Sequence, residues 1–146
     1  MKIAIGSDEK TILTDWVIDY VKKKGFKVEL FGVLKGEKRE WAEVGLKLAE
    51  SVANKRCHEG ILFCWTGTGV SIAANKVRGI RAALCFNSEQ AKGARRWNHA
   101  NILVMSLCLT TKKLAKKIID VWFDESFSKE EFDIRNVERI KNYEKS

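Results

Sequence analysis

The chain has 146 residues, of which 45% are hydrophobic and 32% charged, a composition typical of one globular domain with its own core. It holds no run of 18 or more apolar residues, so we expect no membrane-spanning helix and no membrane partner. The net charge is +8, but the lysines stand in short runs typical of solvated helix faces, and zinc-finger, RNA-binding and basic-zipper motifs are missing. We therefore expect no nucleic-acid partner, and attraction of anionic substrates instead.

Five short apolar segments alternate with helical patterns along the chain. The expected strands span residues 2–6, 27–31, 60–64, 80–85 and 101–105. Apolar residues spaced three and four apart predict helices over residues 9–24 and 40–54. Further helices are expected over residues 68–76, 88–97, 111–122 and, in the charged C-terminal segment, 129–145. This alternation predicts an α/β fold, with an open parallel sheet of five strands, helices on both faces and a C-terminal helix.

Such a sheet directs ligands to the carboxyl ends of its strands. Four segments would gather at that edge: residues 7–9, residues 64–69, the stretch after Cys85 and the stretch near Ser106. We find no linker, repeat or low-complexity segment, so residues 1–146 are expected to form a single domain.

The most informative segment runs from Gly60 to Lys76 and is predicted to form a strand, a glycine turn and a helix. Cys64 ends the strand, and the first amides of the helix would point toward it. A thiol beside an anion-favouring helix N-terminus can act as a base while the amides stabilise an oxyanion. From spacing alone, a phosphate loop or a plain structural turn explains the segment equally well.

The four cysteines are Cys57, Cys64, Cys85 and Cys108, and none forms a Cys-x-x-Cys pair. Zinc spacing is therefore absent, and we expect three of the four to pack as small apolar side chains in a reducing compartment. The N-terminus runs directly into a strand and shows no signal peptide, which predicts a cytoplasmic protein.

Several motifs in chain order resemble the type-B ribose-5-phosphate isomerase family, which also contains the galactose-6-phosphate isomerase subunits. They are Lys2 to Asp8, Cys64-x-Thr66-Gly67-x-Gly69, Ser71 to Lys76, Gly79 to Ala83, and Asn98-x-Ala100-Asn101. The resemblance covers nearly the whole chain. It implies a Rossmann-like sheet and an aldose–ketose isomerase that needs no metal or other cofactor. It also implies a homodimer or tetramer with shared active sites.

By this resemblance Cys64 is the base that moves a proton between two sugar carbons, and Thr66 and the loop amides hold the enediolate oxygens. The chemistry is consistent, because a carbon acid beside a carbonyl needs a positioned base and a preorganised oxyanion site. Cys64 and Thr66 are thus the expected catalytic residues. The expected substrate-binding residues are Asp8, Glu9, Trp65, Gly67, Thr68, Gly69, Val70, Ser71, Trp97, Asn98 and His99.

Other family positions are altered. The His that usually follows Asp8 is Glu9, and the His credited with opening the sugar ring is Trp97. The Asp-Tyr-Pro before the second helix is Glu40, Trp41 and Ala42. The arginine expected after the fifth strand is replaced by Cys108. The phosphate-binding Arg-His-x-x-Arg that the family often carries near the C-terminus is replaced at its three named positions by Phe132, Asp133 and Asn136. Arg135 and Arg139 lie near those positions but out of register.

These changes predict a sugar or sugar phosphate other than ribose 5-phosphate as substrate, because lysine only partly replaces a bidentate arginine. A short sugar phosphate that stays open-chain would not need the missing His. The alternative is a degenerate family member that binds a metabolite or a protein partner without catalysis.

Individual residues have further alternatives. Trp65 and Trp97 either line a pocket or fill core space, and His99 is either an acid–base group or a surface or hydrogen-bonded residue. Asp8 is expected both to contact the ligand and to cap the first helix. The last helix has an apolar side, formed by Phe132, Ile134 and Val137, that a second subunit could cover.

Overall fold

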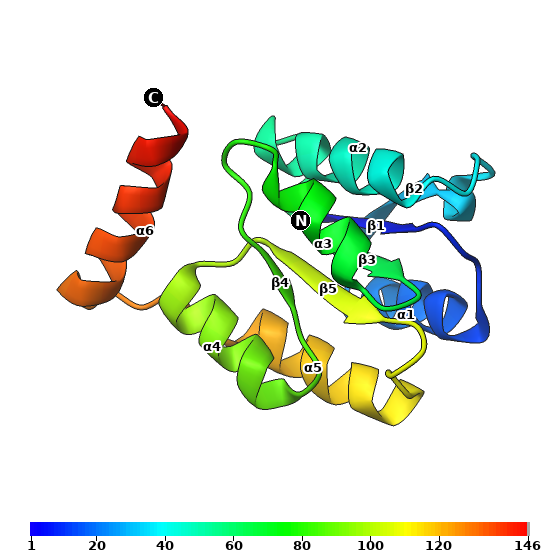
Figure 1. Cartoon of the computed structure of the whole chain (residues 1–146). Coiled ribbons are helices and arrows are strands. Elements are labelled where there is room, and N and C mark those ends of the chain that lie inside the picture. Colours follow the sequence, from blue (N-terminus) through cyan, green and yellow to red (C-terminus); the bar gives the residue numbers. More distant parts are fainter. Residues whose placement is uncertain (146) are drawn as a thin grey trace.

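The computed structural model describes residues 1–145 and contains a five-stranded parallel sheet covered by helices on both faces (Figure 1). The elements are β1 (Lys2–Ser7), α1 (Ile12–Lys23), β2 (Lys27–Gly32), the 3-10 helix η1 (Val33–Lys35), α2 (Trp41–Ala53), β3 (Glu59–Cys64), α3 (Thr68–Asn75), β4 (Ala82–Leu84), α4 (Ser88–Asn98), β5 (Ile102–Ser106), α5 (Lys112–Asp124) and α6 (Glu131–Glu144). The strand order is β2-β1-β3-β5-β4, with every ladder parallel. The predicted fold class is confirmed.

The central strands β1, β3 and β5 are buried over nearly their whole length, and their middle residues are apolar, because helices cover both faces of the sheet. On one face, residues such as Val17 of α1 and Ile118 of α5 pack against β1, β3 and β5. On the other face, Leu48 of α2 and Val70 of α3 do so. Within residues 1–145, every helix is too short or too polar to cross a membrane.

The first helix begins at Ile12, the first residue of its apolar pattern and three residues later than the predicted start at residue 9. Thr11 is the N-cap: its hydroxyl accepts a hydrogen bond from the Thr14 amide, and the Thr14 hydroxyl accepts one from the Thr11 amide. This reciprocal pair satisfies two amides at the helix start. The prediction that Asp8 caps this helix is therefore wrong, and Asp8 lies in the connection between β1 and the cap.

The fourth strand is shorter than predicted. Ile80 belongs to a turn, in which its amide bonds to the Val77 carbonyl, and only Ala82–Leu84 pair with β5. β4 is an edge strand, and the side chain of Asn75 both donates to the Ala82 carbonyl and accepts from its amide. Asn75 thus satisfies backbone groups that an edge strand leaves unpaired.

A buried guanidinium ties the C-terminal half to the sheet. Arg95 of α4 donates to the Trp122 carbonyl, to the Ala100 carbonyl and to the Glu59 carboxylate, at 2.8 to 2.9 Å. The indole of Trp122 donates to the other oxygen of Glu59. Because every bond of this cluster joins a different pair of elements, it holds α4 and α5 against the start of β3.

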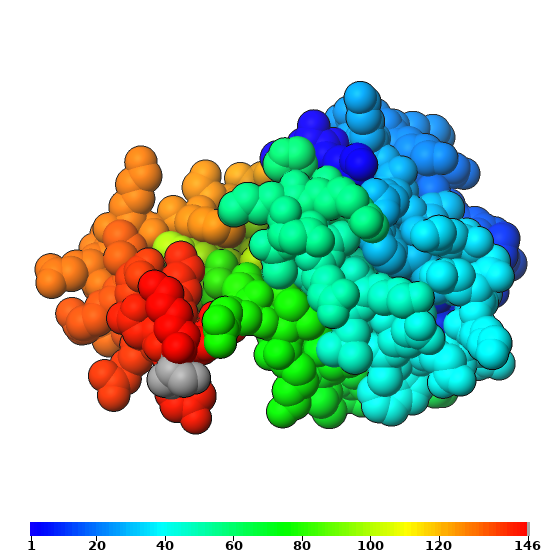
Figure 2. Space-filling view, turned by 90° about the horizontal axis from the view of Figure 1, so that it is seen from above, coloured from blue at the N-terminus to red at the C-terminus, as the bar shows by residue number. Residues whose placement is uncertain are grey.

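Helix α6 extends from the body of the molecule. In the space-filling view of Figure 2 its orange and red residues form one end of the molecule, opposite the blue and cyan N-terminal half. Val137 is buried against its own chain, whereas Phe132, Ile134 and Ile140 are exposed. The helix therefore keeps most of its apolar side uncovered within one chain.

Candidate active site

Cys64 ends β3 at the carboxyl edge of the sheet. Its partner in the register is Ser106, the last residue of β5, and its carbonyl accepts a hydrogen bond from Leu107 at 3.0 Å. Cys64 is 5% exposed, and it packs on the face of the sheet that α2 and α3 cover. The thiol therefore lies at the carboxyl end of β3, on the face of the sheet that α3 covers.

The turn after Cys64 requires glycine. Gly67 has a φ of +83°, and a Cβ there would lie 2.5 Å from Cδ1 of Leu84. Gly67 is also the N-cap of α3, and the first intrahelical bond runs from the Ser71 amide to its carbonyl. The amides of the first turn, Thr68 to Val70, have no intrahelical acceptor; the Thr68 amide lies 3.5 Å from the Thr66 hydroxyl, and those of Gly69 and Val70 are available to an oxyanion.

The side chains around the turn differ in polarity and in exposure. The hydroxyls of Thr66 and Thr68 are 2.9 Å apart, and they present a polar pair at the loop. The Val70 side chain is buried in the core, so only its amide can reach a ligand. The ring of Trp65 is 61% exposed, which contradicts the alternative that it fills core space.

Trp41 lies beside the glycine loop, although the sequence analysis did not place it in the site. It is the first residue of α2, and a Cβ at Gly69 would lie 2.9 Å from its indole carbon Cε3. Gly69 is therefore needed for the close packing of this ring against the loop. The aromatic residue at the start of the predicted helix was the only available signal.

Asp8 and Glu9 follow β1 at the same edge. The hydroxyl of Ser7 donates to the Glu9 carbonyl at 2.6 Å and accepts from the Glu9 amide at 3.0 Å, which fixes this turn. Arg39, from the loop before α2, donates through Nε to the Asp8 carbonyl at 3.1 Å and through Nη2 to the Glu9 carboxylate at 2.9 Å. Burial raises the pKa of Asp8 above its ordinary value of 3.8, while the charge of Arg39 opposes the shift. Sequence reasoning missed Arg39, which no local pattern marks.

The segment after β5 also lies at the carboxyl ends of the strands, next to the turn that follows Cys64. The Ser106 hydroxyl donates to the Trp65 carbonyl at 2.8 Å and lies 3.3 Å from the Cys108 thiol. Cys57 and Cys85 are buried, as expected of packed cysteines, but Cys108 is exposed, and the third buried cysteine is Cys64 itself. Burial raises the pKa of the Cys85 thiol to about 12, which disfavours its thiolate form.

The structure does not bring Trp97, Asn98 and His99 to this edge. They end α4 at the opposite, amino edge of the sheet, where Arg81 donates to the carbonyls of Asn98 and His99. His99 adopts a left-handed conformation, stacks on Phe127 and lies 3.1 Å from the Ser128 carbonyl through Nε2. These contacts fit the hydrogen-bonded alternative for His99 better than an acid–base role.

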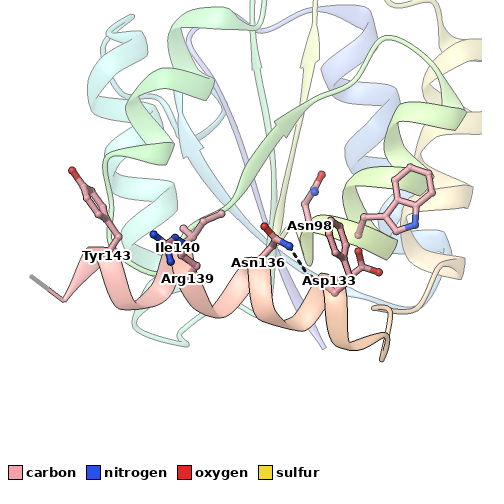
Figure 3. A pocket seen from close by; sticks show the side chains of 8 residues that line it. Asn98, Asp133, Asn136, Arg139, Ile140 and Tyr143 are labelled. Carbon is pink, nitrogen blue, oxygen red and sulfur yellow. Dashed lines mark hydrogen bonds between the residues drawn. The ribbon is translucent and has the colours of Figure 1, made fainter.

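A groove of about 990 Å³ lies between the end of α4 and α6. Figure 3 shows Asn98 on one side of it and the labelled residues of α6 on the other. Trp97 is 56% exposed here, which again contradicts a core-filling role. The lining residues are Trp97, Asn98, Phe132, Asp133, Asn136, Arg139, Ile140 and Tyr143.

Among residues 1–145 the structure contains no group of three or more His, Cys, Asp or Glu side chains able to hold a metal ion.

Comparison with known proteins gives a consistent family. The family model described as Ribose/Galactose Isomerase matches residues 3–142. Ribose-5-P isomerase B of Listeria innocua is 40% identical over 129 residues, which cover 88% of this chain and 87% of the relative. D-erythrulose-4-phosphate isomerase of Pectobacterium atrosepticum is 37% identical over 129 residues, with coverage of 87% and 85%.

Solved structures agree with this result. Ribose-5-phosphate isomerase B of Clostridium thermocellum matches with a TM-score of 0.92 and 41% identity, over 99% of this chain and 98% of the other. These findings confirm the resemblance carried by the Cys64 to Lys76 segment. The chain therefore belongs to the ribose/galactose isomerase family and is one of its sugar-phosphate isomerases.

Proposed function

We propose that this isomerase interconverts an aldose and a ketose phosphate, with the Cys64 thiolate as the base. The single observation that supports this most is the position of Cys64, at the carboxyl end of β3 directly before the free amides of α3. A thiolate is the form of cysteine that accepts a proton. No other thiol among residues 1–145 stands at the start of that helix.

In the proposed reaction, Cys64 removes the proton from the carbon next to the substrate carbonyl. The electron pair left behind forms the enediolate, and its oxygens accept hydrogen bonds from the loop amides and from the Thr66 hydroxyl. Cys64 then returns the proton to the neighbouring carbon. Preorganised donors aimed at a developing oxyanion typically contribute about 10²–10³ in rate. Because the base and these donors together meet both needs of the reaction, we propose that it requires no metal.

The proposed substrate is a four-carbon sugar phosphate rather than ribose 5-phosphate. A four-carbon sugar with a phosphate on its terminal oxygen has no hydroxyl left to close a stable ring. It therefore does not need the ring-opening His whose position here holds Trp97. The relative from Pectobacterium, named for its action on D-erythrulose 4-phosphate, supports this choice.

A complete site is proposed to need a partner subunit, in a homodimer or a tetramer. Cys64 and the loop lie at one edge of the sheet, and Trp97 and Asn98 lie at the other. Helix α6 keeps Phe132 and Ile140 exposed in the groove that Asn98 lines, so a second chain would cover apolar surface there. In that arrangement the partner subunit supplies Trp97 and Asn98 to the substrate.

A cytoplasmic location is also proposed. The buried thiols of Cys57 and Cys85 are unpaired, which is usual in a reducing compartment. The alternative of a binding protein without catalysis is not favoured by the comparisons, since the relatives named above are isomerases.

Steady-state kinetics on a panel of sugar phosphates tests the proposal. The panel contains D-erythrose 4-phosphate, ribose 5-phosphate, a hexose 6-phosphate and unphosphorylated erythrose. We expect the four-carbon phosphate to have the highest kcat/KM, about a hundredfold above ribose 5-phosphate, the factor a general acid commonly contributes. Ribose 5-phosphate as the best substrate would overturn the substrate assignment, and no turnover of any compound would favour the binding protein.

A further inference from the structure

We propose that Arg39 binds the phosphate group of the substrate. The inference rests on the proposed sugar-phosphate chemistry and adds a specificity residue to that site. It depends on the contacts of Arg39, on the place of its loop in the fold and on the loss of arginines elsewhere.

The contacts of Arg39 fix its direction without using all of its donors. Nε bonds to the Asp8 carbonyl at 3.1 Å, and Nη2 bonds to the Glu9 carboxylate at 2.9 Å. A guanidinium has five N–H donors, so three remain. Among residues 1–145, Nη1 has no hydrogen-bond acceptor, and the side chain is 68% exposed. The group is therefore oriented and still open to a ligand.

The loop that holds Arg39 touches both sides of the candidate active site. Arg39 bonds to the turn that follows β1, and two residues later Trp41 packs against Gly69 of the glycine loop. The ends of β1 and β3 are neighbours in the sheet, with Ser7 opposite Phe63, the residue before Cys64. Arg39 thus lies at the periphery of the same end of the sheet as Cys64, and we call this place the rim.

Arg39 offsets the negative charge of Glu9 at this rim. Glu9 occupies a position where the family resemblance predicts a His. The Glu9 carboxylate alone would repel a phosphate dianion. Three positions where arginine is expected from the family resemblance hold Cys108, Phe132 and Asn136 instead. Exposed ion pairs stabilise a protein little, so Arg39 can share its bonds between Glu9 and a phosphate. Its planar fork suits two parallel hydrogen bonds to phosphate oxygens.

The test compares full-length Arg39→Gln with Lys10→Gln as the matched control. Lys10 is a neighbouring cation of the same edge, and its ammonium is paired with Asp15 at 2.6 Å. On the best sugar phosphate of the panel, we expect Arg39→Gln to raise KM about ten- to a hundredfold with a smaller change in kcat, as for the loss of charge-assisted hydrogen bonds. Arg39→Lys should recover part of the loss. Equal effects of the Gln variants at 39 and 10 would overturn the proposal, because they would show a general charge effect.

A binding measurement separates this inference from the proposed reaction. Titration calorimetry with inorganic phosphate on Cys64→Ala and on Cys64→Ala/Arg39→Gln needs no turnover. We expect phosphate to bind the first protein and to bind the second about tenfold or more weakly. Equal affinity, or no binding to either protein, would overturn the role of Arg39 whatever the activity. An inactive wild type with the expected binding difference would instead contradict only the proposed reaction.

Discussion

Cys64 lies at the carboxyl ends of the parallel strands, whereas Asn98 lies at their amino ends. Cys64 faces Ser106 in the register of β3 and β5, whereas Asn98 ends the helix that leads into the start of β5. The five residues of β5 separate the two edges, and at about 3.3 Å per residue they span roughly 13 Å or more. One small sugar phosphate cannot touch both residues of one chain, so the proposed site joins two chains.

Mixing two inactive variants tests the shared site. Cys64→Ala and Asn98→Ala should each have little activity as homodimers, because every site lacks one of the two residues. Unfolding and refolding the mixture should form heterodimers in which one of the two sites is complete. Random pairing then predicts recovery of about a quarter of wild-type activity.

Light scattering on the separate variants is the control, and it should show a dimer or a tetramer in each case. A monomer at micromolar concentration, or no recovery in a mixture shown to contain heterodimers, would contradict the shared site.

The Trp97→His substitution tests why the proposed substrate is open-chain. Trp97 is exposed and packs back over Gly93, so the smaller imidazole should be accommodated without loss of the fold. A His at this position offers a general acid for ring opening, and we expect about a tenfold gain in kcat/KM for ribose 5-phosphate. D-erythrose 4-phosphate, which has no ring to open, should gain nothing. An equal gain on both substrates would contradict the ring-opening explanation.

Acid stability should depend on Asp120 of α5. Burial alone would raise its pKa, but hydrogen bonds from Lys24, Tyr20 and Lys116 outweigh burial and lower the pKa from 3.8 to about 2. The stabilisation is therefore present above about pH 4 and is lost as the pH falls through 2. Asp120→Asn should lower the free energy of unfolding by about 1 kcal/mol at pH 7, after allowance for solvent screening, and by much less at pH 2.

Urea unfolding at the two pH values measures this difference. Asp19→Asn, on the exposed side of α1, is the control and should leave the stability unchanged at both. A loss of equal size at pH 7 and pH 2 would show that Asp120 acts through packing rather than charge.

The sheet and its carboxyl edge were predictable because each strand is a short apolar segment followed by a turn signal. The order of segments then places Ser7, Cys64 and Ser106 together, as the ladders confirm. The ends of elements were less predictable. The first helix was predicted from residue 9, where Glu9, Lys10 and Thr11 carry no apolar signal, whereas the Thr11 capping pair starts it at Ile12. The outermost strand lost residues to a turn that its apolar side chains do not reveal.

Contacts between distant loops could not be predicted from periodicity. Arg39 meets Asp8 and Glu9 across 31 and 30 residues of sequence, from a loop with no regular pattern. The placement of Asn98 was hidden for a different reason. The motif that contains Asn98 indicates a family position, but it does not indicate to which subunit's site Asn98 belongs. The direction of α4 places Asn98 away from Cys64 of the same chain.

Hydrogen–deuterium exchange into the substrate tests the central claim, proton transfer by Cys64, most directly. D-erythrose 4-phosphate is incubated in D₂O with wild type, Cys64→Ala or Cys64→Ser, and proton NMR follows the hydrogen on the carbon beside the carbonyl. Circular dichroism establishes that each variant is folded. We predict exchange by the wild type, at least about a hundredfold less by Cys64→Ala, and little by Cys64→Ser, because a hydroxyl is a far weaker base than a thiolate. Exchange by folded Cys64→Ala at the wild-type rate would contradict the account.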